Sequence, residues 1–404
     1  MAGATILQLG AGALLGESIR ILCDEGFKVH AIDRDPDAPG FALADCSEPI
    51  DFGDVDAVTN CARRIGANLI LGVNELGVWT AAQASARLGL PNVPVDVAWR
   101  CLHKGEMRAA WQRAGLSQPA FRVIKNLDEL PAAADALGYP LVLKPTFGWG
   151  SRGVSVMRSQ ADLPRAAEFA REHARQPDFI VEQMIVGTEL TIEGLVQHGR
   201  PVVLAMSDKQ HQRHDQYCVA MALDYPPDLP EAKQREVEEL VKHAVAALGL
   251  HNGAFHCECM TNAAGDYLVE LGARGGGGHI FSRIVETASG VCMPSALTRI
   301  FLGEDVDLRP KWRRAVSYRF FAPPEGVFLL AENIETARRM PNILEFGFNL
   351  AAGTVVRPIS GDADRPGFVI STGVTRQEAI DSAQQAIGAV RFVMSESTSA
   401  MKPA

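Results

Sequence analysis

The sequence lacks both a long apolar run and an excess of positive charge. No apolar stretch reaches the ~18–20 residues that span a bilayer. The N-terminus has no basic flank before Ile6, so we expect neither a membrane span nor a signal peptide. Acidic residues outnumber basic ones by 48 to 39, which gives a net charge of −9. This balance makes the chain a poor candidate for binding nucleic acid or an anionic membrane.

Internal repeats and low-complexity segments are also missing. The 404 residues are 47% hydrophobic and 22% charged, a composition that excludes a mainly disordered or fibrous chain. At roughly 100–200 residues per domain, the length predicts two or three domains.

Cysteine is sparse and scattered. The eight cysteines show no spacing typical of a disulfide framework, and without an export signal we expect reduced thiols in a cytoplasmic protein. Cys257 and Cys259 are the one close pair. No second pair lies at metal-site spacing, so a structural zinc site there has little support.

The first hundred residues alternate short apolar runs with helical patterns. The apolar runs are Thr5–Leu9, Lys28–Ile32 and Asn68–Gly72, and helical periodicity covers Leu14–Glu25 and Val78–Leu88. This βαβ pattern predicts a parallel sheet with helices on both faces.

Beyond Cys101 the pattern of strands and helices changes. We expect helices at Lys104–Ala114, Asp128–Leu137, Asp162–Arg175, Glu231–Leu248 and Arg376 to about Phe392. We expect strands at Phe121–Ile124, Leu141–Lys144, Gly153–Met157, Phe179–Met184, Glu189–Val196, Ala254–Met260, Tyr267–Leu271, Tyr318–Phe321, Thr354–Val356 and Phe368–Ser371.

A glycine-rich segment, Thr146–Gly153, follows a strand that ends near Lys144. Its three glycines let the backbone approach an anion and direct N–H groups at it, and Ser151 and Arg152 can add donors. A strand-like run comes next in place of a helix, which argues against a Walker-type loop. We interpret the segment as a flap over nucleotide phosphates. A flexible hairpin with an ordinary surface lysine is the alternative.

A second glycine-rich turn, Gly10–Gly16, follows the first expected strand, and Asp33 ends the next one. This arrangement is compatible with a dinucleotide site. Tight packing of any strand against the following helix also needs small residues, so a nicotinamide-cofactor site stays an alternative.

Two acidic residues are expected to meet across a hairpin. If Ala254–Met260 pairs with Tyr267–Gly272, a turn near residue 264 places Glu258 directly opposite Glu270. Opposed like charges destabilise a strand pair by up to about 1 kcal/mol, and a divalent cation between them removes that penalty. Carboxylate oxygens suit Mg²⁺, which commonly takes one or two carboxylates plus phosphate oxygens. A slipped register with two exposed acids is the alternative, although the neighbouring Gly275–Gly278 suits a loop that admits substrate.

Together these segments resemble the ATP-grasp superfamily, in particular its carboxylate–amine ligases near biotin carboxylase and the L-amino-acid ligases that form dipeptides. The resemblance covers nearly the whole chain and implies an α/β fold with an α+β lid. It implies an N-terminal doubly wound parallel-sheet domain at 1–100 and a two-lobed ATP-grasp domain at 101–320, with its lid at about 120–190. A small C-terminal α+β segment at 321–404 would complete the grasp domain.

The resemblance also implies an ATP site assembled from short motifs. Lys104 and Lys144 look like the two phosphate-contacting lysines of the family. Glu182 and the backbone at Ile185 would read adenine, and Glu189 would hold the ribose hydroxyls. The phosphate loop would contribute Gly148, Gly150, Ser151 and Gly153.

The metal and substrate motif has one departure from the family. Glu258 and Glu270 match its magnesium ligands, and Arg274 matches the arginine that steadies an acylphosphate or a substrate carboxylate. The family often has Glu-x-Asn-x-Arg, where this chain has Gly272 at the Asn position. Glycine has no side chain to ligate a metal, so the sequence leaves the number of Mg²⁺ ions open at one or two. Mn²⁺ is expected to substitute for Mg²⁺. The small residue favours the dipeptide ligases over biotin carboxylase.

The implied activity is ATP-dependent formation of an amide bond through an acylphosphate, with release of ADP and phosphate. Joining of amino acids, or of an amino acid and another amine or carboxylate, is the expected reaction. The candidate residues are Arg274, Lys209 and His211 for catalysis, and Glu75, Arg274, Gly276 and Gly277 for substrate binding.

Three rival functions stay open from the sequence. They are an ATP-grasp ligase or carboxylase acting on a non-amino-acid carboxylate, a nicotinamide-dependent oxidoreductase, and a nucleotide-binding protein without catalysis. The expected partners are small-molecule carboxylates and amines, without nucleic acid or membrane. A cytoplasmic homodimer is what the resemblance suggests.

Overall fold

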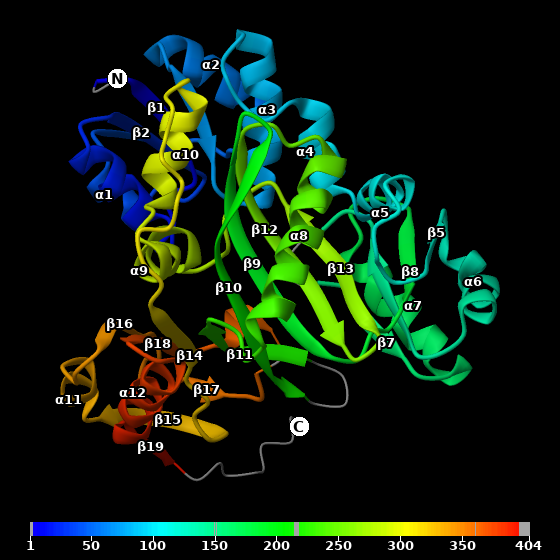
Figure 1. The fold of residues 1–404 in the computed structure, drawn as a ribbon. Coiled ribbons are helices and arrows are strands. Elements are labelled where there is room, and N and C mark those ends of the chain that lie inside the picture. Colours follow the sequence, from blue (N-terminus) through cyan, green and yellow to red (C-terminus); the bar gives the residue numbers. More distant parts are fainter. Residues whose placement is uncertain (1–2, 149, 151, 214–217, 360, 396–404) are drawn as a thin grey trace, which may run out of the picture. The chain divides into compact units, whose positions relative to one another are not determined.

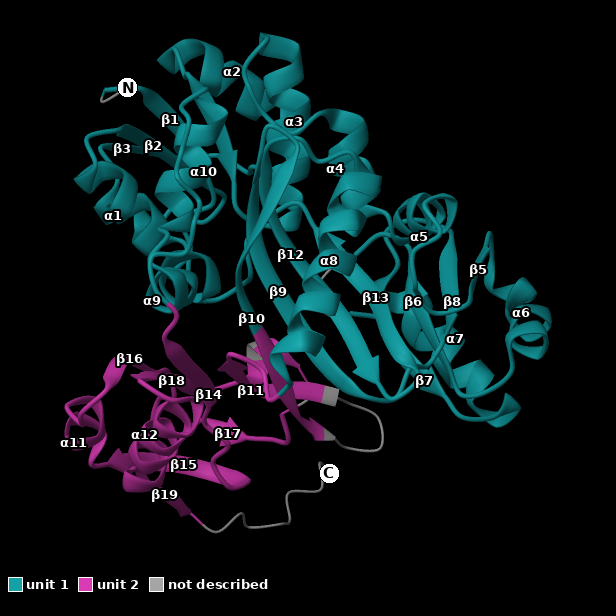
Figure 2. Ribbon diagram, in the orientation of Figure 1, with its two compact units in different colours: residues 1–206, 229–312 teal, residues 207–228, 313–404 magenta. Residues whose placement is uncertain are grey.

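A computed structural model of the chain describes residues 3–148, 150, 152–213, 218–359 and 361–395. The chain divides into two compact units (Figure 2). Unit 1 comprises Met1–Met206 and Leu229–Trp312, and unit 2 comprises Ser207–Asp228 and Arg313–Ala404.

Unit 1 begins with a four-stranded parallel sheet, as the βαβ pattern predicted (Figure 1). Its strands in spatial order are β3 (Cys46–Pro49), β2 (Lys28–Asp33), β1 (Thr5–Leu9) and β4 (Leu69–Gly72). The helices of this part are α1 (Gly16–Asp24), α2 (Val55–Ile65), α3 (Glu75–Leu88) and α4 (Val95–Leu102). Side chains of α2 and α3 share a core with Leu7, Ile32 and Ile70 of the sheet.

Strand β3 and helix α2 were not predicted from the sequence. The β3 residues are polar and mostly exposed at the sheet edge, so they carry no apolar run. Helix α2 does have end signals, since the Asp54 side chain accepts the N–H groups of Asp56 and Ala57, and Gly66 (φ 65°) closes the helix.

The turn at Gly10 is explained by local packing. The Ala11 N–H donates to Oδ2 of Asp33 at 2.9 Å, so the carboxylate at the end of the second strand is used by the turn itself. A Cβ at Gly10, where φ is +96°, would lie 2.6 Å from Cδ1 of Leu15.

The lid segment of unit 1 is a second sheet with two helices against it. Its strands in order are β5 (Phe121–Ile124), β8 (Phe179–Gln183), β6 (Leu141–Pro145) and β7 (Ser155–Met157), all antiparallel to their neighbours. Helices α6 (Leu130–Leu137) and α7 (Leu163–His173) share its core. The glycine-rich segment joins β6 to β7, which confirms the predicted position between two strands, and the two strands are antiparallel.

A third group of strands in unit 1 carries the acidic residues. It contains β9 (Thr188–Gln197), β12 (Gly253–Asn262) and β13 (Gly265–Gly272), with helices α5 (Lys104–Arg113) and α8 (Glu231–Leu248) beside them (Figure 1). Along β12, Cys257 and Cys259 are fully buried, whereas His256 and Glu258 are partly exposed. The alternation follows from the period of two in a strand. The remaining helices of unit 1 are α9 (Val285–Ser289), α10 (Met293–Phe301) and the π-helical segment Ile280–Ile284.

Unit 2 is built from antiparallel strands. Strand β10 (Arg200–Arg213) begins in unit 1 and ends in unit 2. Next to its second half, in spatial order, lie β11 (Cys218–Tyr225), β14 (Ala315–Phe320), β18 (Gly367–Gly373) and β16 (Ile343–Phe348). The small sheet of unit 2 contains β17 (Val355–Val356), β15 (Gly326–Glu332) and β19 (Arg391–Ser395). Its helices are α11 (Ile334–Arg338) and α12 (Arg376–Ala389). Short 3-10 helices among the described residues of both units are Pro39–Leu43, Leu127–Glu129, Gln160–Asp162 and Asp362–Asp364.

The prediction that the last helix continues to about Phe392 was wrong. Helix α12 ends at Ala389, and Arg391–Ser395 forms β19, which pairs with β15. The sequence Arg-Phe-Val-Met is compatible with both structures, and the partner strand that decides between them lies far away in the chain.

Two further observations concern membrane-spanning helices and the cysteines. Among the described residues, no helix combines the length and the apolar character needed to cross a bilayer. The cysteines whose side chains are described are all free thiols. Cys257 and Cys259 lie side by side with their sulfurs 3.9 Å apart, fully buried, as expected for small apolar core residues.

Candidate active site

The acidic pair lies where the predicted register places it. Glu258 of β12 is directly opposite Glu270 of β13, and His256 is opposite Gly272. A register shift follows at Glu258/Cys259, so one residue of β13 bulges beyond the pair. The expectation that Glu258 and Glu270 meet across the hairpin is therefore confirmed.

Lys104 connects the acidic pair to the phosphate loop. It begins α5, and its Nζ lies 3.1 Å from Oε1 of Glu270 and donates to the carbonyl of Gly148 at 2.8 Å. The residue is only 7% exposed, so solvent screens this ion pair little. His103 caps α5 by accepting the Glu106 N–H and so fixes the start of the helix.

Lys144 lies in a buried group of three charges. Oε2 of Glu182 is 2.7 Å from Nζ of Lys144, and Oε1 is 2.7 Å from Nε of Arg108. Burial would raise the pKa of Glu182, but the charges of Arg108 and Lys144 outweigh it and lower the pKa to about 2. The Glu182 side chain is thus occupied by two cations, so a contact to adenine from this residue would come from its backbone.

Arg108 was not predicted as a site residue. It is 1% exposed, and its Nη1 also donates to the carbonyl of Leu268 at 2.5 Å. One signal was available, because Arg108 lies four residues after Lys104 and therefore on the same face of α5.

The hinge segment after β8 runs close to β12. A Cβ at Gly187 would lie 2.2 Å from the carbonyl oxygen of Thr261, and the Asn262 side chain donates to the carbonyl of Val186 at 2.8 Å. Ile185 is partly exposed beside these contacts, and Glu189 is opposite Met260 in the sheet. Their proposed roles toward adenine and ribose stay predictions.

Glu75 and Arg274 form an ion pair in unit 1. Glu75 begins α3, and its Oε1 lies 2.5 Å from Nη2 of Arg274. Burial opposes the charge of Glu75, yet the neighbouring Arg274 lowers the pKa of this carboxyl below its ordinary value. The structure therefore brings together two residues that were predicted separately as substrate contacts.

Glu193 is a second residue that the sequence interpretation missed. It is fully buried, its Oε1 lies 2.5 Å from Nδ1 of His256, and its Oε2 accepts the Gly276 N–H at 2.9 Å. Burial would lower the pKa of His256, but Glu193 outweighs it and raises the pKa to about 9. The signal was the spacing of Glu189 and Glu193, which places them on one face of β9.

The glycines of the loop after β13 differ in how closely neighbouring atoms pack around them. A Cβ at Gly276 would lie 2.5 Å from Cγ2 of Ile280 and 2.7 Å from Oε1 of Glu193. At Gly277 a Cβ would meet nothing within 4 Å. Close packing therefore requires glycine at 276, whereas the open space at 277 suits a contact with substrate.

The donor set around the acidic pair fits magnesium. Two opposed carboxylates supply hard oxygen ligands, and the Lys104 ammonium beside Glu270 already compensates their charge. Glu258 also lies 3.7 Å from Nε2 of His256. Glu258 and Glu270 would hold the ion, with Lys104 next to it.

The phosphate loop is described in part. Gly150 (φ 67°) and Gly153 (φ 75°) have backbone conformations that favour glycine. A Cβ at Gly153 would lie 2.9 Å from Cβ of His173. Ser151, predicted as a phosphate donor, lies outside the described residues.

Lys209 and His211 belong to unit 2. Both lie on β10, where Lys209 is opposite Leu223 and His211 is opposite Ala220. His211 lines a hollow of about 430 Å³ together with Met221, Arg319 and other residues of unit 2. Their catalytic role stays a prediction.

Two segments match known families. Residues 137–283 match the ATP-grasp domain family, and residues 319–395 match the L-amino acid ligase C-terminal domain 2.

Among curated relatives, the alanine–anticapsin ligase of Bacillus subtilis (strain 168) is 28% identical over 323 residues. That region is 72% of this chain and 66% of the relative, so the chain spans just under two thirds of that ligase. The formate-dependent phosphoribosylglycinamide formyltransferase of Paraburkholderia xenovorans (strain LB400) is 28% identical over 407 residues, 96% of this chain and 95% of the relative.

Among solved structures, the L-amino acid ligase from Bacillus licheniformis has the same fold. The two superpose with a TM-score of 0.85 over 98% of this chain and 100% of that chain, at 21% sequence identity. The mixed α/β architecture expected from the sequence is thereby confirmed.

Proposed function

We propose that this chain, which belongs to the ATP-grasp superfamily of carboxylate–amine ligases, joins a small carboxylate such as an amino acid to an amine through an acylphosphate. One observation carries the proposal. Glu258 and Glu270 are opposed in register, and Lys104 contacts Glu270 and the phosphate loop at once. Two opposed carboxylates that can hold a metal, a lysine and a glycine-rich loop at one place suit the binding of a nucleoside triphosphate.

The reaction has two steps. A carboxylate is a poor electrophile, because oxide would have to leave. Its oxygen takes the γ-phosphoryl group of ATP, which gives an acylphosphate and ADP. The amine then attacks the acyl carbon, phosphate leaves, and the amine gives up a proton. Catalysis of this kind depends mainly on positioning and on neutralising phosphate charge.

Residues of unit 1 supply most of these roles. Lys104 would contact the phosphates, and Lys144 would do so from the end of β6. Magnesium, when bound by Glu258 and Glu270, would supply further charge neutralisation. Arg274 would hold the carboxylate, and Glu75, already paired with Arg274, would orient the amine.

Glu193 would act as a positioning residue. It accepts the Gly276 N–H and holds His256, which in turn lies beside Glu258. The substrate loop and the metal ligands are thus connected through one buried carboxylate. The lid over residues 120–190 would close over the acylphosphate and exclude water.

The substrate class is supported by the two matched families. An amino acid as the carboxylate fits the L-amino acid ligase segment at 319–395 and the alanine–anticapsin ligase relative. A small carboxylate that is not an amino acid is the second candidate, favoured by the formate-dependent relative that matches 96% of this chain. The nicotinamide alternative is not favoured by any of these relatives.

A matrix screen tests the proposal. The full chain is incubated with ATP, Mg²⁺ and pairs of amino acids, formate and other small carboxylates and amines, with detection of nucleotide, phosphate and product mass. We expect ADP, phosphate and an amide product. Release of AMP and pyrophosphate would contradict the acylphosphate, and ATP binding without turnover across the matrix would favour a non-catalytic protein.

Several finer expectations remain proposals. They are the three-domain division, the number of magnesium ions and the use of Mn²⁺ in their place, a homodimer, and a cytoplasmic location. The free thiols are compatible with a reducing compartment. Analytical ultracentrifugation of the purified chain measures the oligomeric state directly.

A further inference from the structure

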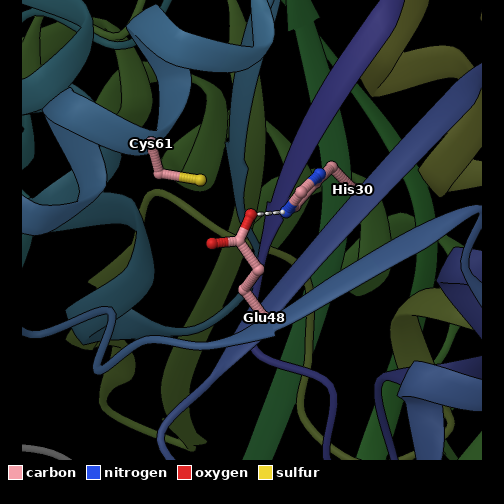
Figure 3. A group of neighbouring side chains, drawn as sticks. All are labelled: His30, Glu48 and Cys61. Atoms are coloured by element: carbon pink, nitrogen blue, oxygen red, sulfur yellow. Dashed lines mark ion pairs between the residues drawn. The ribbon is translucent and has the colours of Figure 1, made fainter.

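A group of three metal-ligand side chains lies in the N-terminal sheet of unit 1, outside the ATP site. His30 is on β2, Glu48 on the edge strand β3 and Cys61 on helix α2 (Figure 3). Their donor atoms all lie within 4.8 Å of one another. Among the described side chains, no other three histidine, cysteine or acidic groups lie this close together.

Nε2 of the His30 imidazole has no hydrogen-bond partner with suitable geometry. This atom is 2.9 Å from Oε1 of Glu48, which is an ion-pair distance, but the two groups are not oriented as a hydrogen bond. The residue is 9% exposed, and Nε2 is buried.

A cationic group already lies between the carboxylate and the thiol. Nη2 of Arg64 lies 2.6 Å and 2.7 Å from the two oxygens of Glu48 and 3.6 Å from Sγ of Cys61. The Arg64 side chain is 57% exposed, so it can turn into solvent without a large loss of packing. The position therefore attracts a cation, and the present occupant can leave.

From these contacts we propose that His30, Glu48 and Cys61 form a binding site for a divalent transition metal of the zinc type. Nitrogen, sulfur and oxygen ligands suit Zn²⁺ or Co²⁺, whereas Mg²⁺ prefers oxygen alone. Donor atoms of a tetrahedral zinc site lie roughly 3.3–3.8 Å apart, so small side-chain shifts are enough. Cys61 gives its proton to solvent as it binds, and water takes the fourth position.

Such a site would stabilise the edge of the sheet. Strand β3 has four residues, most of them exposed, and lies at the end of the strand order. A metal would connect it to β2 and to α2 at one point. Metal ions would enter at the surface, where Glu48 is 33% exposed.

Cobalt binding to the full-length, tag-free chain tests the site in the presence of excess Mg²⁺. We expect one equivalent of Co²⁺ to bind and to give a thiolate-to-cobalt charge-transfer band. Cys61→Ser should lose the band, while the control Cys292→Ser should keep it. Zn²⁺ should displace Co²⁺ and raise the midpoint of thermal unfolding.

Two further variants test the proposed site even if Cys61→Ser fails to fold. Glu48→Gln, at a partly exposed position, should weaken Co²⁺ affinity by about tenfold or more, and Arg64→Gln should strengthen it because a competing cation is removed. The proposal is overturned if no band forms, if the affinity is the same in wild type and Glu48→Gln, or if binding is weak and non-stoichiometric. None of these readouts depends on ligase activity.

Discussion

Individual charged residues of the candidate site form ion pairs that are buried away from water. Glu182 is 3% exposed and is bound on both carboxylate oxygens, by Arg108 and by Lys144. Removal of one partner from such a group costs more than the contact itself contributes, because the remaining charges stay buried. The stability of this part of the fold therefore depends on all three residues together.

The pH dependence of stability follows from Glu182. Its pKa is lowered to about 2 in the folded chain, against an ordinary value of 4.5. The stabilisation is therefore complete above pH 4.5 and is lost as the pH falls from 4.5 toward 2. We expect Glu182→Gln to lower the free energy of unfolding by about 3–5 kcal/mol at pH 7, and this difference from wild type should shrink over that range. Denaturant titrations at several pH values measure it.

The exposed Glu231→Gln, on α8, is the matched control and should show no such difference. A difference between wild type and Glu182→Gln that stays constant from pH 7 to pH 2 would contradict the assignment of the low pKa.

Lys104 provides a second test at this scale. Because its Nζ contacts both Glu270 and the phosphate loop, Lys104→Met should lower kcat/KM for ATP by about 10²-fold or more. Lys242→Met, which removes a partly exposed lysine paired with glutamates on α8, should leave turnover unchanged. Coupled assays of ADP release report both. Activity of Lys104→Met within threefold of wild type would contradict the proposed phosphate contact.

At the scale of elements, many helices and strands of unit 1 were predicted near their observed positions, whereas α2 was missed despite its end signals, and β15 and β16 of unit 2 were also missed. Helix α8 was predicted with its observed ends, and the hairpin of β12 and β13 had the expected register. Strand β3 was not predicted because its residues are polar. The predicted helix continued into the first two residues of β19, because nothing local separates the two states there. The bulge after Glu258 also has no local signal, since it depends on how β13 fits its neighbours.

The glycine loop after β13 gives a prediction with an internal control. Gly276→Ala should lower the free energy of unfolding by about 1–3 kcal/mol, because its Cβ would overlap Ile280 and Glu193. Gly277→Ala should change it by less than about 0.5 kcal/mol, because open space surrounds that position. Thermal and denaturant unfolding compare the two variants. Equal losses would show that the loop is not packed as described.

At the scale of the whole molecule, the sequence located most of the charged residues but few of their contacts. The hairpin register placed Glu258 opposite Glu270, whereas motifs indicated Lys104 and Lys144 only one by one. The contact of Arg108 with Glu182 and the contact of Glu193 with His256 each join segments far apart in the chain. Such pairs depend on the packing of separate elements, which no local pattern reveals.

The likeness to solved structures extends over almost the whole chain at 21% identity. A backbone of this kind tolerates wide change in side chains, so the function has to be argued from the residues of the site and not from the fold. The binding of ATP and magnesium proposed here depends on the charged groups of unit 1, and it can be measured directly.

The most direct measurement is the effect of Mg²⁺ on nucleotide affinity. A non-hydrolysable ATP analogue is titrated calorimetrically into wild type and into Glu270→Gln, with and without Mg²⁺. With Glu258 and Glu270 as joint ligands, Mg²⁺ should strengthen binding to wild type by about tenfold or more and leave binding to Glu270→Gln nearly unchanged. The variant should bind the analogue without Mg²⁺ at least as well as wild type does. An equal gain from Mg²⁺ in both proteins would contradict the account.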